Sequence, residues 1–151
     1  MDKAELIDRL EALCVKRECC TFDLRRKALE ALDRDQAAAE EVVRHLVDGK
    51  FADDRRYAEA FAREKSAITG WGPEKIRYTL RMKGISRQDI DAALEQRDPE
   101  ASARRLEKVC EAKWKTLQGD PYAKFKLIKY ALSRGYGYDE VSEIAESLLK
   151  K

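Results

Sequence analysis

Apolar residues recur at helical spacing along almost the whole chain, and no segment shows the sustained alternation that is typical of a strand. Three long stretches, which begin near residues 4, 54 and 100, each carry one apolar face. Their apolar positions are Leu6, Leu10, Leu13 and Cys14 in the first, Tyr57, Phe61 and Ile68 in the second, and Leu106, Val109, Cys110, Trp114 and Leu117 in the third. The pattern therefore predicts an all-α fold.

A shorter helix is expected after each long one. The first runs from Thr21 to Leu32 with Thr21 as its N-cap, and the second starts at Gly72-Pro73-Glu74, where proline suits the first helical position. The third starts at Asp120-Pro121, with the aspartate as its cap. Gly84 and Gly135 supply the left-handed residues that end the second and third of these helices.

A further helix closes each group. Its apolar stripe is Val42, Val43, Leu46 and Val47 in the first group, Ile90, Ala93 and Leu94 in the second, and Val141, Ile144, Ala145 and Leu148 in the third. The three-helix pattern thus repeats with a period of about 50 residues. Because repeats of this kind pack mainly on their neighbours, we predict an elongated array of three tandem three-helix repeats, over residues 1–50, 51–97 and 98–151.

Charge is distributed unevenly between these helices, although the net charge is only +2 and 40% of the residues are charged. Acidic residues gather on the closing helices and cations on or beside the middle ones. The cations are Lys75, Arg77, Arg81, Lys83 and Arg87 in the second repeat, Lys124, Lys126, Lys129 and Arg134 in the third, and Arg25 and Arg26 in the first.

Two interpretations of this asymmetry stay open. If the repeats stack in register, the cations form a basic ridge that binds phosphates or an acidic protein surface. Alternatively, they form solvated helix faces that the acidic helices neutralise. Aromatic residues near the same helices either stack on nucleic-acid bases or pack between repeats; they are Trp71, Tyr78, Tyr122, Tyr130, Tyr136 and Tyr138.

No catalytic residue, metal site or cofactor is expected. Asp53 and Asp54 point about 100° apart on a helix, so they fit helix-capping and first-turn acids better than an acid–base pair. The only histidine, His45, has no serine or cysteine partner nearby in sequence, and Gly70-Trp71-Gly72-Pro73 lacks the Gly-Lys-Ser/Thr ending of a phosphate loop.

The cysteines and the hydropathy bear on the compartment. Cys14, Cys19, Cys20 and Cys110 form no Cys-x-x-Cys pair, so we expect buried free thiols in a reducing environment. No apolar run approaches the roughly eighteen residues of a membrane span, and the first residues do not resemble a signal peptide. A cytoplasmic protein without membrane association is the expectation.

Three stretches in the middle of the chain resemble the central signature of the bacterial RecX regulators. They are Gly49-Lys50-Phe51-Ala52-Asp53-Asp54-Arg55-Arg56-Tyr57-Ala58, Gly70-Trp71-Gly72-Pro73-Glu74-Lys75-Ile76-Arg77 and Leu80-Arg81-Met82-Lys83-Gly84-Ile85. The resemblance covers residues 49–95 and extends more loosely over both flanks.

It implies a non-enzymatic protein that binds the RecA filament on single-stranded DNA and inhibits its ATPase, recombinase and coprotease activities, thereby modulating DNA repair and the SOS response. By analogy, Lys75, Arg77, Arg81 and Lys83 are the first choices for the contact surface.

Two rival functions remain. A stand-alone nucleic-acid-binding helical module would bind single- or double-stranded DNA without RecA, with a steep salt dependence. A protein adaptor would instead use the acidic closing helices, for example through Asp91 and Glu143. We expect a monomer, because packing between the repeats would use up the apolar stripes.

Overall fold

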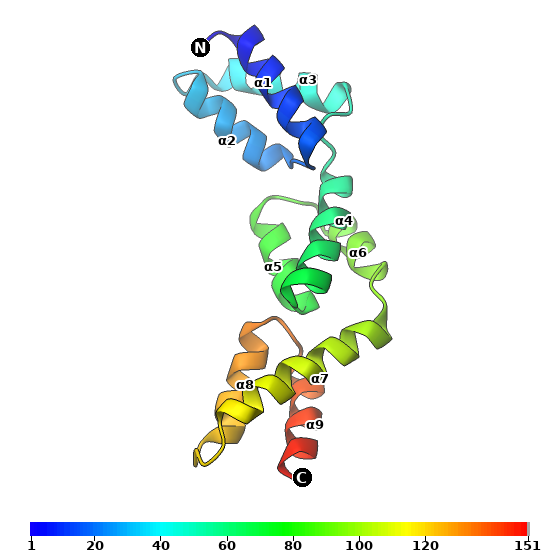
Figure 1. Ribbon diagram of the computed structural model, residues 1–151. Coiled ribbons are helices and arrows are strands. Elements are labelled where there is room, and N and C mark those ends of the chain that lie inside the picture. Colours follow the sequence, from blue (N-terminus) through cyan, green and yellow to red (C-terminus); the bar gives the residue numbers. More distant parts are fainter. Residues whose placement is uncertain (151) are drawn as a thin grey trace. The chain divides into compact units, whose positions relative to one another are not determined.

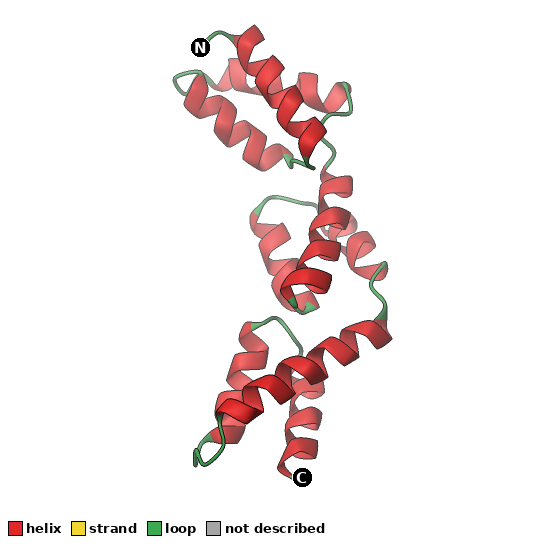
Figure 2. Ribbon diagram, viewed as in Figure 1, coloured by secondary structure: helices red, strands yellow, loops and turns green. Residues whose placement is uncertain are grey.

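The structure is a computed structural model that describes residues 1–150. Over that range it contains α-helices, one π-helical segment and no strand, as Figures 1 and 2 show. The all-α prediction is therefore confirmed. The helices are α1 (Lys3–Lys16), α2 (Thr21–Ala31), α3 (Gln36–Asp48), α4 (Asp54–Glu64), α5 (Pro73–Met82), α6 (Arg87–Glu95), α7 (Pro99–Thr116), α8 (Ala123–Ser133) and α9 (Tyr138–Leu149), and the π-helix η1 (Lys65–Thr69) follows α4.

The chain divides into two compact units. The first consists of residues 1–60 and 80–92, and the second of residues 61–79 together with residues 93 onward. Helices α4, α5 and α6 each supply residues to both units. The division into repeats at residues 1–50, 51–97 and 98–151 stays a prediction, as does their elongated arrangement.

The first unit has its main core among α1, α2 and α3, with α3 packed against the other two. Three kinds of position fill it: the predicted stripe of α1, two residues of α2 one turn apart, and the predicted stripe of α3. The residues of these three helices that are buried in the core are Leu6, Leu10, Cys14, Leu24, Ala28, Ala39, Val42 and Leu46, and Cys19 and Ala52 join them from the connecting segments. Val47, which was placed on the α3 stripe, is 41% exposed and lies outside this core.

The second unit has an equivalent core among α7, α8 and α9, all three of which pack on one another. Leu106 and Cys110 of α7 meet Leu127 and Ala131 of α8 and the α9 stripe, which confirms the apolar faces expected for α7 and α9. Trp114 is half-buried against the same cluster.

A close backbone crossing joins two distant segments within the second unit. The Gly72 N–H donates to the Arg134 carbonyl at 2.7 Å, and the Glu74 N–H donates to the Gly135 carbonyl at 2.9 Å. A Cβ at Gly72 would lie 2.4 Å from the Gly135 carbonyl oxygen, and a Cβ at Gly135, where φ is +98°, would lie 2.4 Å from Lys75 Cβ. Both positions therefore require glycine.

Several predicted helix ends are confirmed. Asp53 caps α4, since its Oδ1 accepts from the Arg56 N–H at 3.0 Å. Pro73 is the first residue of α5, as expected. Gly84 has the expected left-handed backbone, with φ at +71°.

Two predicted caps are wrong. Thr21 is the first helical residue of α2, and Cys20 precedes it as the N-cap. The Thr21 N–H at this helix end donates to the carboxylate of Asp54, so the side chain that caps α2 is that of Asp54 and not that of Thr21. Likewise α8 begins at Ala123 and its N-cap is Tyr122, so Pro121 is not the first helical residue. Asp120 instead accepts from the Tyr122 N–H at 2.8 Å in the preceding turn.

The end of α4 differs from the predicted long helix. The chain passes into the π-helix η1, which Gly70 ends with φ at +76°. A π-helical turn has i→i+5 hydrogen bonds and shifts the phase of the residues that follow. Ile68 is consequently 81% exposed, so its placement on the buried stripe with Tyr57 and Phe61 was wrong.

Candidate functional site

The first unit holds Lys83 in a partly buried ion pair. Its Nζ lies 2.7 Å from Asp23 Oδ2, with side-chain exposures of 28% and 22%, and 5.7 Å from the ring centroid of Tyr57. Burial acts to raise the pKa of Asp23, but the hydrogen bonds from Lys83 and Cys20 and the charge of Lys83 outweigh it, so this pKa lies below its usual range. Lys83 therefore anchors the turn after α5 to α2.

The cations of α2 also have acidic neighbours within the first unit. Arg25 forms an ion pair with Glu40 of α3. Arg26, whose side chain is 65% exposed, has an Nη2 that lies 3.7 Å from Asp23 Oδ1. The sequence left open whether the acidic closing helices neutralise the cations of the middle helices. For Arg25 the structure shows this neutralisation, because Glu40 belongs to a closing helix.

Arg81 and Arg87 are the predicted cations of the first unit that remain most available to a partner. Arg81 is exposed and makes no ion pair within residues 1–150. The side chain of Arg87 is 92% exposed, and its Nε reaches Asp91 Oδ2 only at 3.9 Å. Beside Arg81 on α5, Met82 is 61% exposed.

Hydrogen bonds around Asp54 connect the start of α4 to the start of α2, a contact that the sequence analysis did not predict. Asp54 Oδ1 accepts from the Thr21 N–H at 2.8 Å and its Oδ2 accepts from the Thr21 hydroxyl at 2.9 Å. Arg56 Nε donates to Glu18 Oε1 at 2.9 Å, and its Nη2 donates to the Lys50 carbonyl at 3.1 Å. The only sequence signal was the density of charge in residues 49–58, which here serves to fix α4 to the start of α2.

In the second unit, Lys75 lies on an aromatic platform. Its Nζ is 4.4 Å from the ring centroid of Trp71, and Lys65 Nζ lies 4.9 Å from the same centroid. Phe61 meets this indole edge to face, with ring centroids 6.1 Å apart. Arg77, on the same helix, is half-buried. Lys65 was absent from the predicted set because the π-helix that positions it is not visible in the apolar pattern.

The predicted cations of α8 and its end have different surroundings. Lys124 Nζ lies 3.4 Å from Glu146 Oε1 of α9, and Lys126 Nζ lies 2.5 Å from Asp120 Oδ2. The hydrogen bonds from Lys126 and from the Tyr122 N–H lower the pKa of Asp120. Lys129 is exposed and makes no ion pair in the described part of the chain.

Arg134 has a structural position. Its Nη2 donates to the Thr69 carbonyl at the end of η1, while its own carbonyl accepts from the Gly72 N–H. The buried Tyr136 hydroxyl makes a similar bond to the Gly70 carbonyl at 2.8 Å. Arg134 therefore fastens residues 69–72 to the end of α8 and does not belong to an open basic face.

The predicted aromatic residues separate by exposure. Tyr78, Tyr122 and Tyr138 are 62%, 64% and 59% exposed, whereas Tyr136 is buried. Tyr130 is half-buried, with Lys113 Nζ 4.9 Å from its ring centroid. Only the first three keep the accessible ring face that base stacking requires.

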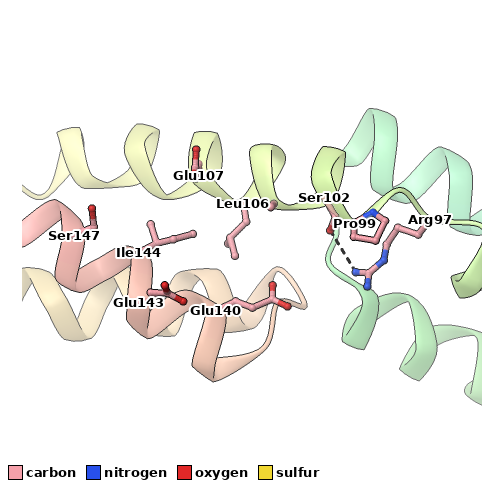
Figure 3. Close-up of a pocket in the computed structure, with 10 residues that line it drawn as sticks. Arg97, Pro99, Ser102, Leu106, Glu107, Glu140, Glu143, Ile144 and Ser147 are labelled. Carbon is pink, nitrogen blue, oxygen red and sulfur yellow. Dashed lines mark hydrogen bonds between the residues drawn. The ribbon is translucent and has the colours of Figure 1, made fainter.

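A pocket of about 380 Å³ opens between α7 and α9 in the second unit. Figure 3 shows Arg97 beside Ser102 at one end, joined by a hydrogen bond of 3.3 Å, and Ser147 at the other. Its lining contains serines and glutamates but no histidine or cysteine, so the pairing that activates a nucleophilic serine does not occur there.

The cysteines and the acidic groups give no sign of redox or metal chemistry. All four cysteines are free and buried, as predicted, while the reducing environment stays a prediction; burial raises the pKa of Cys20 and of Cys110 to about 11. Within residues 1–150, no group of three or more His, Cys, Asp or Glu side chains is placed to hold a metal ion. In the same range, no helix is long and apolar enough to cross a bilayer.

Comparison with known proteins identifies a matching family model and several similar sequences. Residues 53–94, which lie inside the predicted second repeat, match the family model described as RecX, second three-helix domain. The chain is 31% identical over 119 residues to the regulatory protein RecX of Clostridium tetani (strain Massachusetts / E88), which covers 76% of this chain and 54% of that protein. It is 28% identical over 150 residues to the regulatory protein RecX of Salmonella arizonae, covering 93% and 90%.

The structural comparison agrees. A crystal structure of regulatory protein RecX superposes with a TM-score of 0.83 at 25% sequence identity, covering 96% of this chain and 71% of that one. The chain spans about half the length of the curated relatives from Clostridium tetani and Halalkalibacterium halodurans. Because family model, sequence relatives and solved structure agree on one family and on this all-α architecture, the chain belongs to the RecX family.

Proposed function

We propose that this chain is a non-enzymatic, cytoplasmic regulator that binds the RecA filament on single-stranded DNA and inhibits its ATPase, recombinase and coprotease activities. One observation carries the proposal: the segment that matches the RecX family model also presents two exposed arginines, Arg81 and Arg87, at the end of α5 and the start of α6. The regulatory names of the sequence relatives support the same class of function.

The contact surface is narrower than the one the sequence suggested. Lys83, Arg25 and Arg134 are engaged within their own units, so the contact surface that we propose consists of Arg81 and Arg87 in the first unit. An arginine fork binds carboxylate and phosphate oxygens with two parallel hydrogen bonds, which suits both the protein and the DNA of a filament. Bound there, the regulator would hinder the subunit rearrangements that ATP turnover requires.

The test is the single-stranded-DNA-dependent ATPase rate of RecA, measured while this protein is titrated from substoichiometric to equimolar amounts. Wild-type protein should inhibit, and the double variant R81E/R87E should not, because the reversed charges repel the anionic partner. The control is R9E/R44E, which makes the same charge change at exposed arginines of α1 and α3.

The possible outcomes distinguish a wrong contact surface from a wrong function. Wild-type inhibition that R81E/R87E retains in full would exclude this surface, provided that circular dichroism shows an unchanged helical content. Absence of inhibition by the wild-type protein at equimolar ratio would exclude the function itself.

A second candidate function is a nucleic-acid module that acts without RecA. The observation that favours it is the pair of lysine ammonium groups at the Trp71 ring. Such a module would bind DNA alone, with affinity that falls steeply as salt rises, and would affect RecA only by competing for DNA.

A further inference from the structure

The ring of Trp71 holds two ammonium groups that have no acidic partner. Lys65 and Lys75 place their Nζ atoms 4.9 Å and 4.4 Å from its centroid, yet neither forms an ion pair with a carboxylate within residues 1–150. Glu64 and Glu74, the nearest acids in sequence, are both exposed. Like charges gathered without a counter-charge raise the electrostatic energy of the free protein, and an anion would relieve that repulsion.

Of the other lysines predicted for the partner surface, three have an acidic partner and the fourth, Lys129, is exposed. Lys83, Lys124 and Lys126 each have a carboxylate oxygen within 3.4 Å. Lys65 and Lys75 are half-buried as residues, and both are unpaired. An unpaired ammonium group keeps its hydrogen-bond donors available to an oxyanion.

The backbone under this cluster is held at many points, all within the second unit. The Trp71 N–H donates to the Lys65 carbonyl at 2.8 Å, which ties the indole to the start of η1. Gly72 and Glu74 are bonded to Arg134 and Gly135, and the Tyr136 hydroxyl holds the Gly70 carbonyl. A site fixed in this way loses little conformational entropy when it binds.

The local helix geometry points to the same place. Lys65 opens the π-helix η1, and π-helical turns in proteins are frequent at functional sites. Lys65 and Trp71 lie six positions apart, a separation that would not place their side chains on one face of a regular α-helix. The π-turn and the left-handed Gly70 that ends it bring them together.

We propose that Lys65, Trp71 and Lys75 form a binding site for a backbone phosphate of single-stranded nucleic acid. The two ammonium groups donate to the phosphate oxygens, and the indole holds them in position through cation–π contacts. The inference rests on the proposed function, since it assigns a DNA contact to a regulator of a DNA-bound filament.

The test measures fluorescence anisotropy of a dye-labelled oligothymidylate titrated with the full chain over a range of salt concentrations, with no RecA present. The variant K65Q/K75Q should bind more weakly, and its log–log salt slope should be smaller by about 0.7, since the site contacts one phosphate and each phosphate contact on a single strand contributes about 0.7. The matched control K108Q/K115Q removes the same charge from exposed positions of α7 in the same unit. Equal salt slopes for the two double variants would overturn the proposal.

A second readout tests the place of binding. The chain has two tryptophans, so W114F leaves Trp71 as the sole indole. Its emission should change on addition of oligothymidylate, and K65Q/K75Q in the same background should abolish that change. An emission change that poly-glutamate reproduces at equal charge concentration would show a site for acidic protein and overturn the nucleic-acid assignment.

Failure here and failure of the proposed function are distinguishable. The anisotropy assay contains no RecA, so its result depends on the phosphate site alone. ATPase inhibition that R81E/R87E loses and K65Q/K75Q keeps would leave the proposed function standing even if the phosphate site were absent.

Discussion

Replacing Gly135 by alanine should destabilise the second unit by more than an ordinary glycine substitution. Its φ of +98° falls in the left-handed range, which costs a residue with a Cβ about 1–2 kcal/mol. The new Cβ would also lie 2.4 Å from Lys75 Cβ and 2.7 Å from the Lys75 nitrogen, distances that force the two backbone segments apart.

The separation adds a second cost. The hydrogen bond from the Glu74 N–H to the Gly135 carbonyl would lengthen or break, with a loss of about 1 kcal/mol. Together the two effects predict a fall of about 2–3 kcal/mol in the free energy of unfolding. The measurement is urea denaturation followed by tryptophan fluorescence, which reports on the second unit because Trp71 and Trp114 both lie there.

The control is Gly119→Ala. Gly119 belongs to the same unit and has a similar φ of +83°, but a Cβ there would meet no atom within 4 Å. It should therefore show only the backbone cost of about 1–2 kcal/mol. Equal losses in the two variants would refute the reasoning, because they would mean that the crossing of the two segments adds nothing to stability.

Two further predictions concern titrating groups. Asp23→Asn should lower the free energy of unfolding by about 1–2 kcal/mol near neutral pH, because Lys83 then loses its partner in a partly buried position. Since the folded-state pKa of Asp23 is lowered, its contribution is present above the unfolded pKa of about 4 and is lost as the pH falls through the folded value. Urea denaturation should show the two proteins converging in acid, and a difference that persists there would contradict the ion-pair explanation. The thiols of Cys20 and Cys110, with pKa values of about 11, should react with a thiol reagent at neutral pH only as fast as the chain opens. A reaction rate that does not rise with urea would show that these thiols are accessible in the folded protein.

The fold was predictable from the sequence wherever local chemistry decides it. The apolar stripes of α3 and α9 and the cap at Asp53 depend on residues within a turn or two of each other, so their spacing carries the information. The cap of α2 was not predictable in this way, because it comes from Asp54, more than thirty positions along the chain.

The sequence identified the cations of the candidate site, but it could not show which of them are exposed and unpaired. Lys83 and Arg81 look alike in the sequence, and what separates them is Asp23, which approaches one and not the other. Lys65 was missed for a different reason. A π-turn adds a residue to the helical repeat, and no local propensity marks where that happens.

The contact between Gly72 and Gly135 also limits how this sequence can diverge. A side chain at either position collides with the backbone of the other segment, so neither glycine can drift while the crossing persists. Once one of them is lost, the segments separate and the constraint on the other disappears. We therefore expect descendants of this chain to keep both glycines or neither, and joint inheritance of the pair would mark the lineages that share this packing.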